Sequence, residues 1–219
     1  MTSKSDLEKL INDLSSKEKY LNLLITNAGI PGPKVSPDTG DAPSLLDKIW
    51  KNESVEDWQN VFQTNVTACY FSAIAFLPLL QASMEPSGKF VSRSASIIVI
   101  SSMSGIMRDS QGHFAYNAAK GATVHLSKLL SSELEKTSIR VNSIAPGYFP
   151  SELTMNASNA DNKTHMPVEK IHEKGHVPAQ RPGSDEEMAQ AVIFLTKNMY
   201  VNGEVIAVDG GVLNQVPGR

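Results

Sequence analysis

Residues 101–120 read SSMSGIMRDSQGHFAYNAAK, and the rest of the sequence is best interpreted around them. The stretch follows a short β-branched run, residues 97–100, which predicts a buried strand. A helix carries residues i and i+4 on one face, so Tyr116 and Lys120 are expected to point the same way. An ammonium near a phenol lowers the phenol pKa from about 10 toward neutrality. Tyr116 could then exchange a proton with a carbonyl or alcohol oxygen. Alone, Tyr116 and Lys120 also fit an ordinary amphipathic helix, so the neighbouring motifs decide whether the pair belongs to a functional site.

The composition predicts one folded domain over residues 1–219, with 41% hydrophobic and 20% charged residues. A net charge of −3 without a basic cluster argues against a nucleic-acid partner. No apolar run reaches the roughly eighteen residues of a membrane span. The N-terminal residues resemble neither a signal peptide nor a transit peptide. The single cysteine, Cys69, excludes an intrachain disulfide and fits a reducing compartment. We therefore expect a cytoplasmic protein with no membrane contact.

Short apolar runs alternate along the chain with segments of helical periodicity, which predicts an α/β fold with a parallel sheet and right-handed crossovers. The predicted strands are residues 21–25, 97–100, 139–144 and 205–208. The motifs that predict helix starts are Ser5 to Glu8, Ser54, and Ser184 to Glu187. The helix after Ser54 is expected to run over residues 55–83 with a kink at Pro78. Four prolines predict an irregular segment over residues 31–43.

Three of the predicted strands end directly in polar or glycine-containing motifs. These motifs are Asn27-Ala28-Gly29, Ser101-Ser102 and Pro146-Gly147. In open α/β sheets, ligands bind beyond the carboxyl ends of the strands, so the motifs are expected to line one cleft beside the helix of Tyr116. Residues 148–180 are polar and weakly periodic, which predicts a mobile substrate loop or lid rather than a part of the core.

Six motifs, in this order and spacing, resemble the short-chain dehydrogenase/reductase family of the classical type. They cover nearly the whole chain, from the first helix to Gly211. The motifs are TNAG (26–29), NV (65–66), ISSMSG (100–105), YNAAK (116–120), RVNSIAPG (140–147) and NGEVIAVDGG (202–211). Residues 147–154, 180–189 and 200–211 are most similar to fungal members that resemble 3-oxoacyl-acyl-carrier-protein reductases.

The resemblance implies an NAD(P)(H)-dependent oxidoreductase that reduces a carbonyl or oxidises a secondary alcohol. It assigns Tyr116 as the general acid and base. Lys120 would lower the pKa of Tyr116 and hydrogen-bond the nicotinamide ribose. Ser102 would orient the substrate carbonyl, and we prefer it to Ser101 because it stands three residues before the motif's final glycine. Asn65 would hold a water in a proton relay to Lys120.

The resemblance also implies a cofactor, NADP(H) or alternatively NAD(H), and a small ketone or alcohol as substrate. A homodimer or homotetramer is expected, formed through the two long helices and the last strand. The implied cofactor contacts are Asn27, Ala28, Gly29, Tyr116, Lys120, Pro146, Gly147, Phe149 and Ser151.

One departure from the family concerns its glycine-rich phosphate-binding turn, T-G-x-x-x-G-x-G, which this sequence lacks. The motifs correspond to strands four to seven of the family's seven. The resemblance therefore implies an N-terminally truncated Rossmann-type sheet with flanking helices, in which residues 21–25 form an exposed edge. An alternative to the enzyme is a catalytically inactive fragment, a pseudo-enzyme or the product of a misassigned start, that retains only its association surfaces.

The sequence His172-Glu-Lys-Gly-His176 matches a zinc-binding pattern that requires both histidines on one helical face. Gly175 and Pro178 weaken a helix there, so we expect no metal site. His113, at the start of the Tyr116 helix, is expected to serve polar packing.

Overall fold

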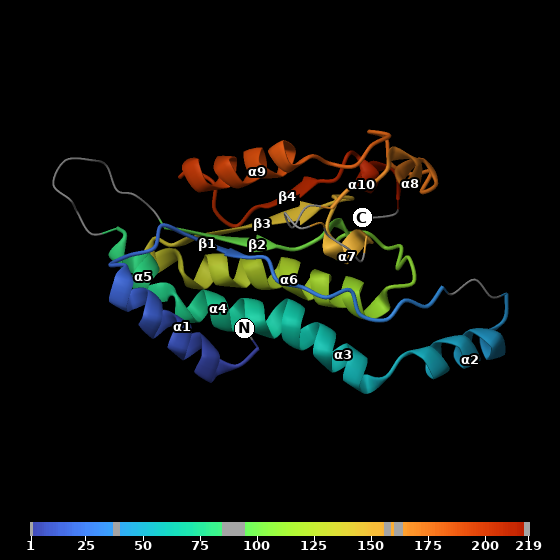
Figure 1. Ribbon diagram of the computed structural model, residues 1–219, viewed down its shortest axis with the longest axis horizontal. Helices are drawn as coiled ribbons and strands as arrows, with labels where there is room; N and C mark the ends of the chain where they lie inside the picture. Colours follow the sequence, from blue (N-terminus) through green and yellow to red (C-terminus); the bar gives the residue numbers. More distant parts are fainter. Residues whose placement is uncertain (1, 37–39, 85–94, 156–158, 160–163, 217–219) are drawn as a thin grey trace.

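A four-stranded parallel sheet, in the order β1-β2-β3-β4, lies at the centre of the computed structural model (Figure 1). The structure describes all residues except 1, 37–39, 85–94, 156–158, 160–163 and 217–219. The strands are β1 (Leu23–Thr26), β2 (Ser96–Ile100), β3 (Arg140–Pro146) and β4 (Val205–Val208). Helices separate successive strands in the sequence and flank the sheet, which confirms the predicted Rossmann-type α/β class.

Helices cover both faces of the sheet. One face packs on α1 (Lys4–Lys17), α4 (Ala68–Ala75) and α6 (Phe114–Glu133), and the other on α9 (Asp185–Lys197) (Figure 1). Successive side chains of a strand point to opposite faces, so a strand covered on both sides needs apolar residues throughout. In β2, Ile97 and Val99 join the cluster under α4 and α6, whereas Ile98 packs with Leu195 of α9.

Strand β1 has one strand neighbour among the described residues. It pairs in parallel with β2, from Leu23 opposite Ser96 to Thr26 opposite Val99. The side chain of Ile25 is 38% exposed. The exposed edge expected for residues 21–25 is thus present in the part of the chain that the structure describes.

The helix predicted over residues 55–83 is divided. It consists of α3 (Val55–Phe62), a π-helical turn (Gln63–Thr67), α4 and α5 (Leu77–Ala82). The kink expected at Pro78 is confirmed, because that proline occupies the first turn of α5. The π turn was not predicted, since no residue-type preference marks it, and such turns occur frequently at functional sites.

The capping boxes at Ser54 and Ser184 are confirmed. The prediction at Ser5 is wrong, because Ser3 caps α1 and accepts a hydrogen bond from the backbone N–H of Asp6 at 3.4 Å. Two Ser-x-x-acid patterns overlap here, and the earlier one adds helical hydrogen bonds at the N-terminus.

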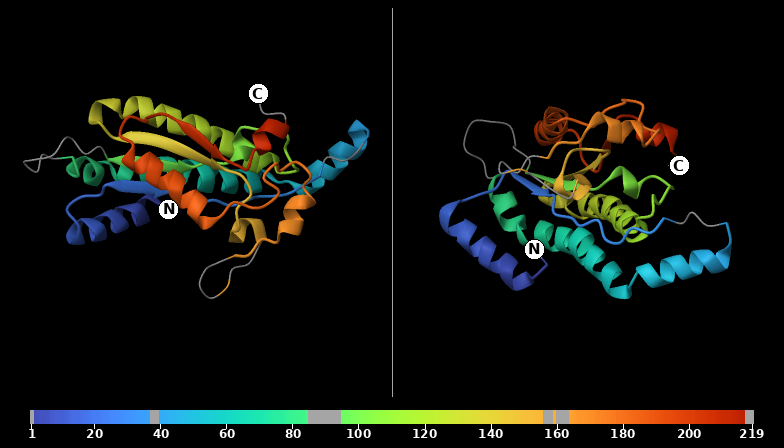
Figure 2. Two further views of the ribbon diagram at one scale, coloured as in Figure 1. Left: turned by 90° about the horizontal axis from the view of Figure 1, so that it is seen from above. Right: turned by 45° about the vertical axis from the view of Figure 1, so that its right-hand side comes forward.

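Helix α2 (Ala42–Asn52) lies partly in the segment that was expected to be irregular. Asp41 caps it, and Pro43 occupies its first turn, where a proline costs no hydrogen bond. The helix extends away from the rest of the molecule in both views of Figure 2. None of its residues is buried, and Trp50 is 79% exposed.

The segment of residues 148–180 contains α7 (Glu152–Met155) and α8 (Val168–His172). Residues 156–158 and 160–163 of the expected lid lie outside the described residues. The expectation that the whole segment stays apart from the core is wrong for its second half. Three of its apolar side chains, Met166, Ile171 and Val177, are buried against Met103 and Val212.

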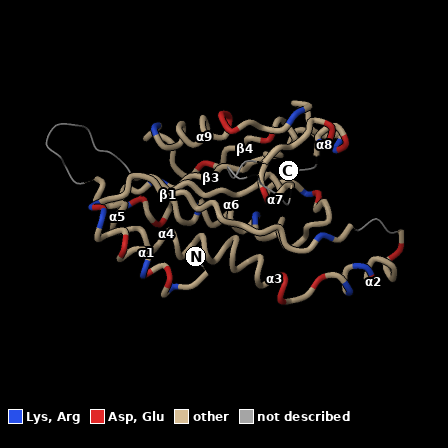
Figure 3. The backbone as a smooth tube through the Cα atoms, viewed as in Figure 1, with Lys and Arg blue, Asp and Glu red and all other residues tan. Residues whose placement is uncertain are grey.

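The remaining short elements are the 3-10 turns Met103–Gly105 and Glu135–Thr137, which flank α6, and α10 (Val212–Gln215). Charged residues of both signs are spread over the outer helices and loops (Figure 3). Among the described residues, no helix combines the length and the apolar character that a membrane crossing requires.

Candidate active site

A cleft of about 950 Å³ lies at the carboxyl ends of β1, β2 and β3. Parallel strands bring these ends to one edge of the sheet, so the three polar motifs that follow them meet there. The cleft is lined by the predicted residues Asn27, Ala28, Gly29, Ser101, Ser102, Tyr116, Lys120, Pro146, Gly147, Phe149 and Ser151. Asn65 is the one predicted site residue that lies behind this cleft instead.

The Ser102 hydroxyl lies close enough to the Tyr116 phenol to act on its pKa. The backbone N–H of Ser104 also donates to Ser102 Oγ at 3.1 Å, which fixes the serine side chain. Burial raises the pKa of Tyr116, and the neighbouring Ser102 hydroxyl lowers it in part. The phenol therefore keeps its proton at neutral pH. The Ser102 and Tyr116 side chains both line the cleft.

Lys120 lies one helical turn after Tyr116, and its side chain is directed at a backbone carbonyl. Its Nζ donates to the carbonyl oxygen of Ile100 at 2.9 Å and lies 5.7 Å from the centroid of the Tyr116 ring. Burial lowers the pKa of Lys120 to about 8. Burial and the Ser102 hydroxyl are the causes that act on the pKa of Tyr116 in this structure, and the lowering of that pKa by Lys120 stays a prediction.

Gly105 allows the serine turn to lie directly against α6. A Cβ at this position would lie 2.4 Å from the carbonyl carbon of Lys120 and 2.5 Å from its oxygen. Both atoms belong to the helix backbone, which cannot move aside without shifting α6. The glycine at the end of the ISSMSG motif thus sets the distance between Ser102 and Tyr116.

Ser101 has a different environment from Ser102. Its Oγ donates to the carbonyl oxygen of Ile144 at 2.9 Å and accepts a bond from Ser143 Oγ at 2.7 Å. The residue is 2% exposed and ties β2 to β3. Of the two serines, Ser102 is the one that contacts Tyr116.

Asn65, in the π-helical turn, clamps the loop after β1. Its Oδ1 accepts from the backbone N–H of Ile30 at 2.8 Å, and its Nδ2 donates to the carbonyl oxygen of Ile30 at 3.0 Å. Its own carbonyl accepts from Thr123 Oγ1 at 3.2 Å. A small cavity of about 10 Å³, the size of one water, lies between Asn65, Thr123 and Cys69. The side chain is committed to Ile30, and its contact with a relay water stays a prediction.

Phe149 forms one wall of the cleft and rests directly on Gly183. A Cβ on Gly183 would lie 2.3 Å from Phe149 Cζ. The backbone N–H of Ser151 donates to Thr154 Oγ1 at 3.0 Å, so this amide is already used at the start of α7. A Cβ on Gly147 would lie 2.6 Å from Asp209 Cα, which explains the glycine where β3 leaves the sheet.

Sequence reasoning missed a polar cluster next to the cleft. The hydroxyl of Tyr148 lies 3.0 Å from His176 Nε2 and accepts a bond of 2.8 Å from Gln111 Nε2. Lys174 Nζ lies 5.3 Å from the centroid of the Tyr148 ring. The members come from three distant parts of the chain, so no local pattern signals the cluster.

The zinc-like pattern does not form a helical pair. Helix α8 ends at His172, and His176 is turned toward Tyr148. Within the described part of the chain, no group of three or more His, Cys, Asp or Glu side chains could hold a metal ion.

Comparison with known proteins agrees with this fold. A family model described as Enoyl-(Acyl carrier protein) reductase matches residues 1–213. The short-chain dehydrogenase/reductase SAT3 of Stachybotrys chartarum is 35% identical over 98% of this chain and 83% of its own length. A rhamnolipid-biosynthesis 3-oxoacyl-[acyl-carrier-protein] reductase of Pseudomonas aeruginosa is 32% identical over 96% of this chain and 73% of its own length.

Solved structures give the same result. The Pseudomonas aeruginosa RhlG/NADP active-site complex superposes with a TM-score of 0.73 at 30% identity, covering 96% of this chain and 73% of that one. The fold and the site define a dehydrogenase or reductase of the Rossmann type. The chain belongs to the short-chain dehydrogenase/reductase family, whose members are NAD(P)-dependent.

The residues of the cleft fit one end of such a cofactor. Ser102, Tyr116 and Lys120 supply hydroxyl and ammonium groups beside the apolar wall of Phe149, as a nicotinamide and its ribose require. Gly29 lets the loop after β1 lie close to Asn65 and Lys120, since a Cβ there would lie 2.9 Å from Asn65 Oδ1 and 3.6 Å from Lys120 Nζ. Lys120 is the one lysine or arginine among the described lining residues. The lining therefore fits the nicotinamide end better than the phosphates.

Proposed function

We propose that this protein interconverts a ketone and a secondary alcohol with NADP(H), using Tyr116 as the proton donor and acceptor. The observation that carries the proposal is that Ser102, Tyr116 and Lys120 line one cleft, with the Ser102 hydroxyl close enough to the phenol to act on its pKa. A carbonyl oxygen that accepts from both hydroxyls would be held and polarised at one point.

In the reducing direction, the bound nicotinamide supplies a hydride to the carbonyl carbon. Ser102 holds the carbonyl oxygen, and the Tyr116 hydroxyl gives its proton to that oxygen as charge develops there. The raised pKa of Tyr116 keeps the phenol protonated until this transfer. In the oxidising direction, Tyr116 would first give its proton to the neutral form of Lys120, and the phenolate would then take the hydroxyl proton of the alcohol while the hydride passes from the alcohol carbon to the oxidised nicotinamide.

Lys120 and Asn65 act behind the tyrosine. With a pKa lowered to about 8, the Lys120 ammonium is a readier proton source than a free lysine, and we assign it to the reprotonation of Tyr116 and to the ribose hydroxyls. Asn65 holds Ile30, and thereby the loop of Gly29, next to Lys120. We assign the cavity beside Asn65 to the water of the proton relay.

NADP(H) is preferred to NAD(H) because a relative of 30% identity is described in complex with NADP. The backbone of Asn27, Ala28, Pro146 and Gly147 would border the nicotinamide, with Phe149 and Ser151 beside it. These contacts concern the nicotinamide end of the cofactor.

Two measurements on the purified chain test the function. NADPH fluorescence is titrated first, and consumption of NADPH is then followed with a panel of small ketones. Saturable binding with ketone-dependent oxidation is expected. Absence of binding at millimolar NADPH would overturn the proposal in favour of the inactive alternative, a chain that only associates.

We also propose that the chain forms a homodimer or homotetramer around this site. Apolar side chains at the surface support this, with Tyr70 on α4 at 40% and Leu129 on α6 at 50% exposure. On the other face of the sheet, Ile193 of α9 is 58% exposed. Light scattering of the wild type and of Leu129→Glu measures the association; a monomeric wild type would contradict it.

A further inference from the structure

A group of cationic side chains stands next to the cleft, on the side of the Tyr116 ring. Lys34 comes from the loop after β1, His113 precedes α6, and Lys174 follows α8. The backbone N–H of Val35 donates to the carbonyl oxygen of Gly112 at 2.7 Å, which fixes the loop of Lys34 against the residue before His113. We call Lys34, His113 and Lys174 the cationic rim.

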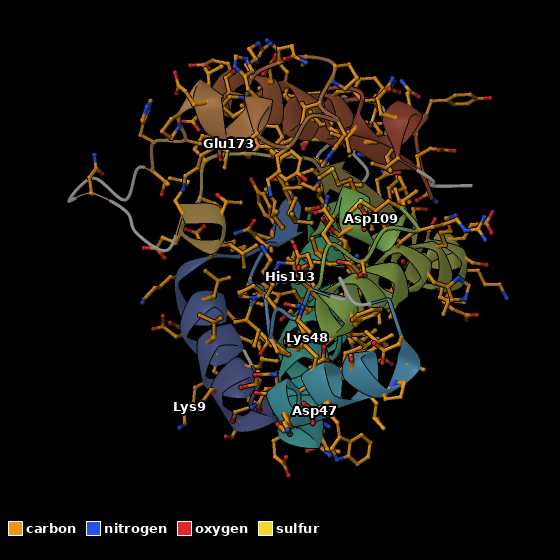
Figure 4. All side chains as sticks on the ribbon, turned by 90° about the vertical axis from the view of Figure 1, so that its right-hand side faces the viewer. Lys9, Asp47, Lys48, Asp109, His113 and Glu173 are labelled. Carbon is orange, nitrogen blue, oxygen red and sulfur yellow. The ribbon has the colours of Figure 1, made fainter. Side chains whose placement is uncertain are left out.

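The rim is adjacent to the reacting end of the cleft. The His113 ring centroid lies 6.4 Å from that of Tyr116, in an edge-on arrangement. Figure 4 looks onto this region, with His113 at its centre and Asp109 and Glu173 above it. A substrate whose carbonyl contacts Tyr116 would therefore extend toward His113.

Lys174 is held in place by the polar cluster beneath it. Its ammonium lies 5.3 Å from the centre of the Tyr148 ring, at cation–π distance. The hydroxyl of Tyr148 is fixed in turn by His176 and Gln111. This network joins the segment of α8 to the loop before α6, so the position of Lys174 is set by the fold.

The ammonium groups of Lys34 and Lys174 both act on the His113 ring. The pKa of His113 is lowered first by burial and then by the ammonium groups of Lys34 and Lys174. The pKa of Lys174 is lowered by burial first and next by Lys34. Lys170 also faces this region, as do two carboxylates, Glu173 beside Lys174 and Asp109 beside Tyr148.

The His113 ring has unused hydrogen-bonding capacity. Its Nδ1 is buried and has no partner at hydrogen-bond geometry among the described residues, and the backbone of Pro33 lies near enough to raise the pKa of the ring. A buried ring nitrogen without a partner costs free energy, and so does the mutual repulsion of two ammonium groups. An anionic group bound between the ammonium groups of Lys34 and Lys174, next to His113, would reduce both of these costs.

We propose that the cationic rim binds a carboxylate or phosphate group on the substrate, so that the substrate is an anionic ketone or alcohol. This inference rests on the proposed function, because the carbonyl of that substrate is the group that Tyr116 and Ser102 hold. The rim selects the far end of the molecule, and the Ser102–Tyr116 pair selects the reacting end.

The first experiment compares matched substrates. NADPH-dependent kcat/KM is measured for 5-oxohexanoate, 7-oxooctanoate, their methyl esters, and 2-oxopropylphosphonate with its dimethyl ester. The wild type is expected to prefer acids over esters by about tenfold, and less at high salt. Comparison of the two keto acids with the phosphonate distinguishes recognition of a carboxylate from recognition of a phosphate-like group. The double variant Lys34→Gln, Lys174→Gln is expected to lose the preference.

The control is Lys9→Gln, on α1 and away from His113 in Figure 4. It removes one positive charge and is expected to keep the preference. Equal kcat/KM for acids and esters in the wild type, or a preference that survives in the double variant, overturns the proposal.

A second readout needs no turnover. The pKa of His113 is followed by NMR while glutarate is added. Glutarate is expected to raise this pKa in the wild type and leave it unchanged in the double variant, whose starting value is higher because the repulsion is gone. If no ketone is reduced but glutarate still raises the pKa of His113, the proposed function fails and the rim stands. An unchanged pKa in the wild type overturns the rim.

Discussion

The ammonium of Lys120 donates a hydrogen bond of 2.9 Å to the carbonyl oxygen of Ile100. Ile100 is the last residue of β2, and Lys120 lies within α6. The bond fastens the helix that carries Tyr116 to the strand end that precedes Ser102. It also holds a cation inside the protein, 4% exposed, which is why the pKa of Lys120 is lowered to about 8.

This buried ammonium predicts a pH dependence of stability. The folded pKa of about 8 lies below the ordinary value of 10.5, so the unfolded chain binds more protons between these values. The free energy of unfolding therefore gains about 2–3 kcal/mol from Lys120 as pH rises through this window. Urea unfolding of the wild type and of Lys120→Met at pH 7, 8, 9 and 10 measures it. The difference between the two proteins isolates Lys120, and a constant difference over this range contradicts the assignment.

Tyr116→Phe is expected to lower kcat by about 10²- to 10⁴-fold, because it removes the proton that the carbonyl oxygen receives. The ring and its packing remain, so NADPH binding is expected to weaken far less than kcat falls. Steady-state kinetics and fluorescence titration check the two effects separately. Tyr20→Phe, at a side chain that is 50% exposed, is the matched control and is expected to match the wild type. Substantial turnover by Tyr116→Phe rules out this role of the phenol.

Gly105→Ala is expected to destabilise the protein by about 1–3 kcal/mol and to lower kcat, because its Cβ meets the backbone of Lys120 at 2.4 Å. The shift separates Ser102 from Tyr116. Gly40→Ala is the control, since a Cβ there meets no atom within 4 Å. Thermal unfolding and ketone reduction are measured for both. Equal behaviour of the two variants is incompatible with the close contact.

Arg140→Met is expected to cost about 3 kcal/mol of stability. The guanidinium is buried and donates to the carbonyl oxygens of Leu195, Val201 and Thr196 at 2.8–3.0 Å. These carbonyls lie at and beyond the end of α9 and would lose their partner. Arg108→Met, at an exposed arginine, is the control. Chemical denaturation measures both, and a cost under 1 kcal/mol for Arg140→Met shows that water replaces the arginine.

The strands were predictable because each is a short apolar run, and β2 and β3 are buried on both faces. The prediction for β4 agrees with the structure at both ends, and the others differ by one or two residues. Helix α2 was not predicted, because prolines were taken as evidence against a helix although Pro43 lies in a first turn. The π turn at Asn65 was not predicted either, since it depends on the packing of α3 and α4 against α6.

The candidate site, like the fold, was predictable from the sequence only in part. The residues that line the cleft follow strand ends in the sequence, and topology alone brings strand ends together. The pKa of Tyr116 could not be predicted from its spacing to Lys120. Spacing fixes which side chains share a helical face, whereas burial and the carbonyl of Ile100 decide their charge.

By itself, the sequence determined the α/β class, the order of the strands along the chain, and Ser102, Tyr116 and Lys120 as candidate residues. Local periodicity and strand-end motifs carry that information. Only the tertiary structure decided that Asn65 clamps Ile30 and that the ammonium groups of Lys34 and Lys174 both act on the pKa of His113. Such relations join residues from distant parts of the chain, and they arise when the sheet and helices pack.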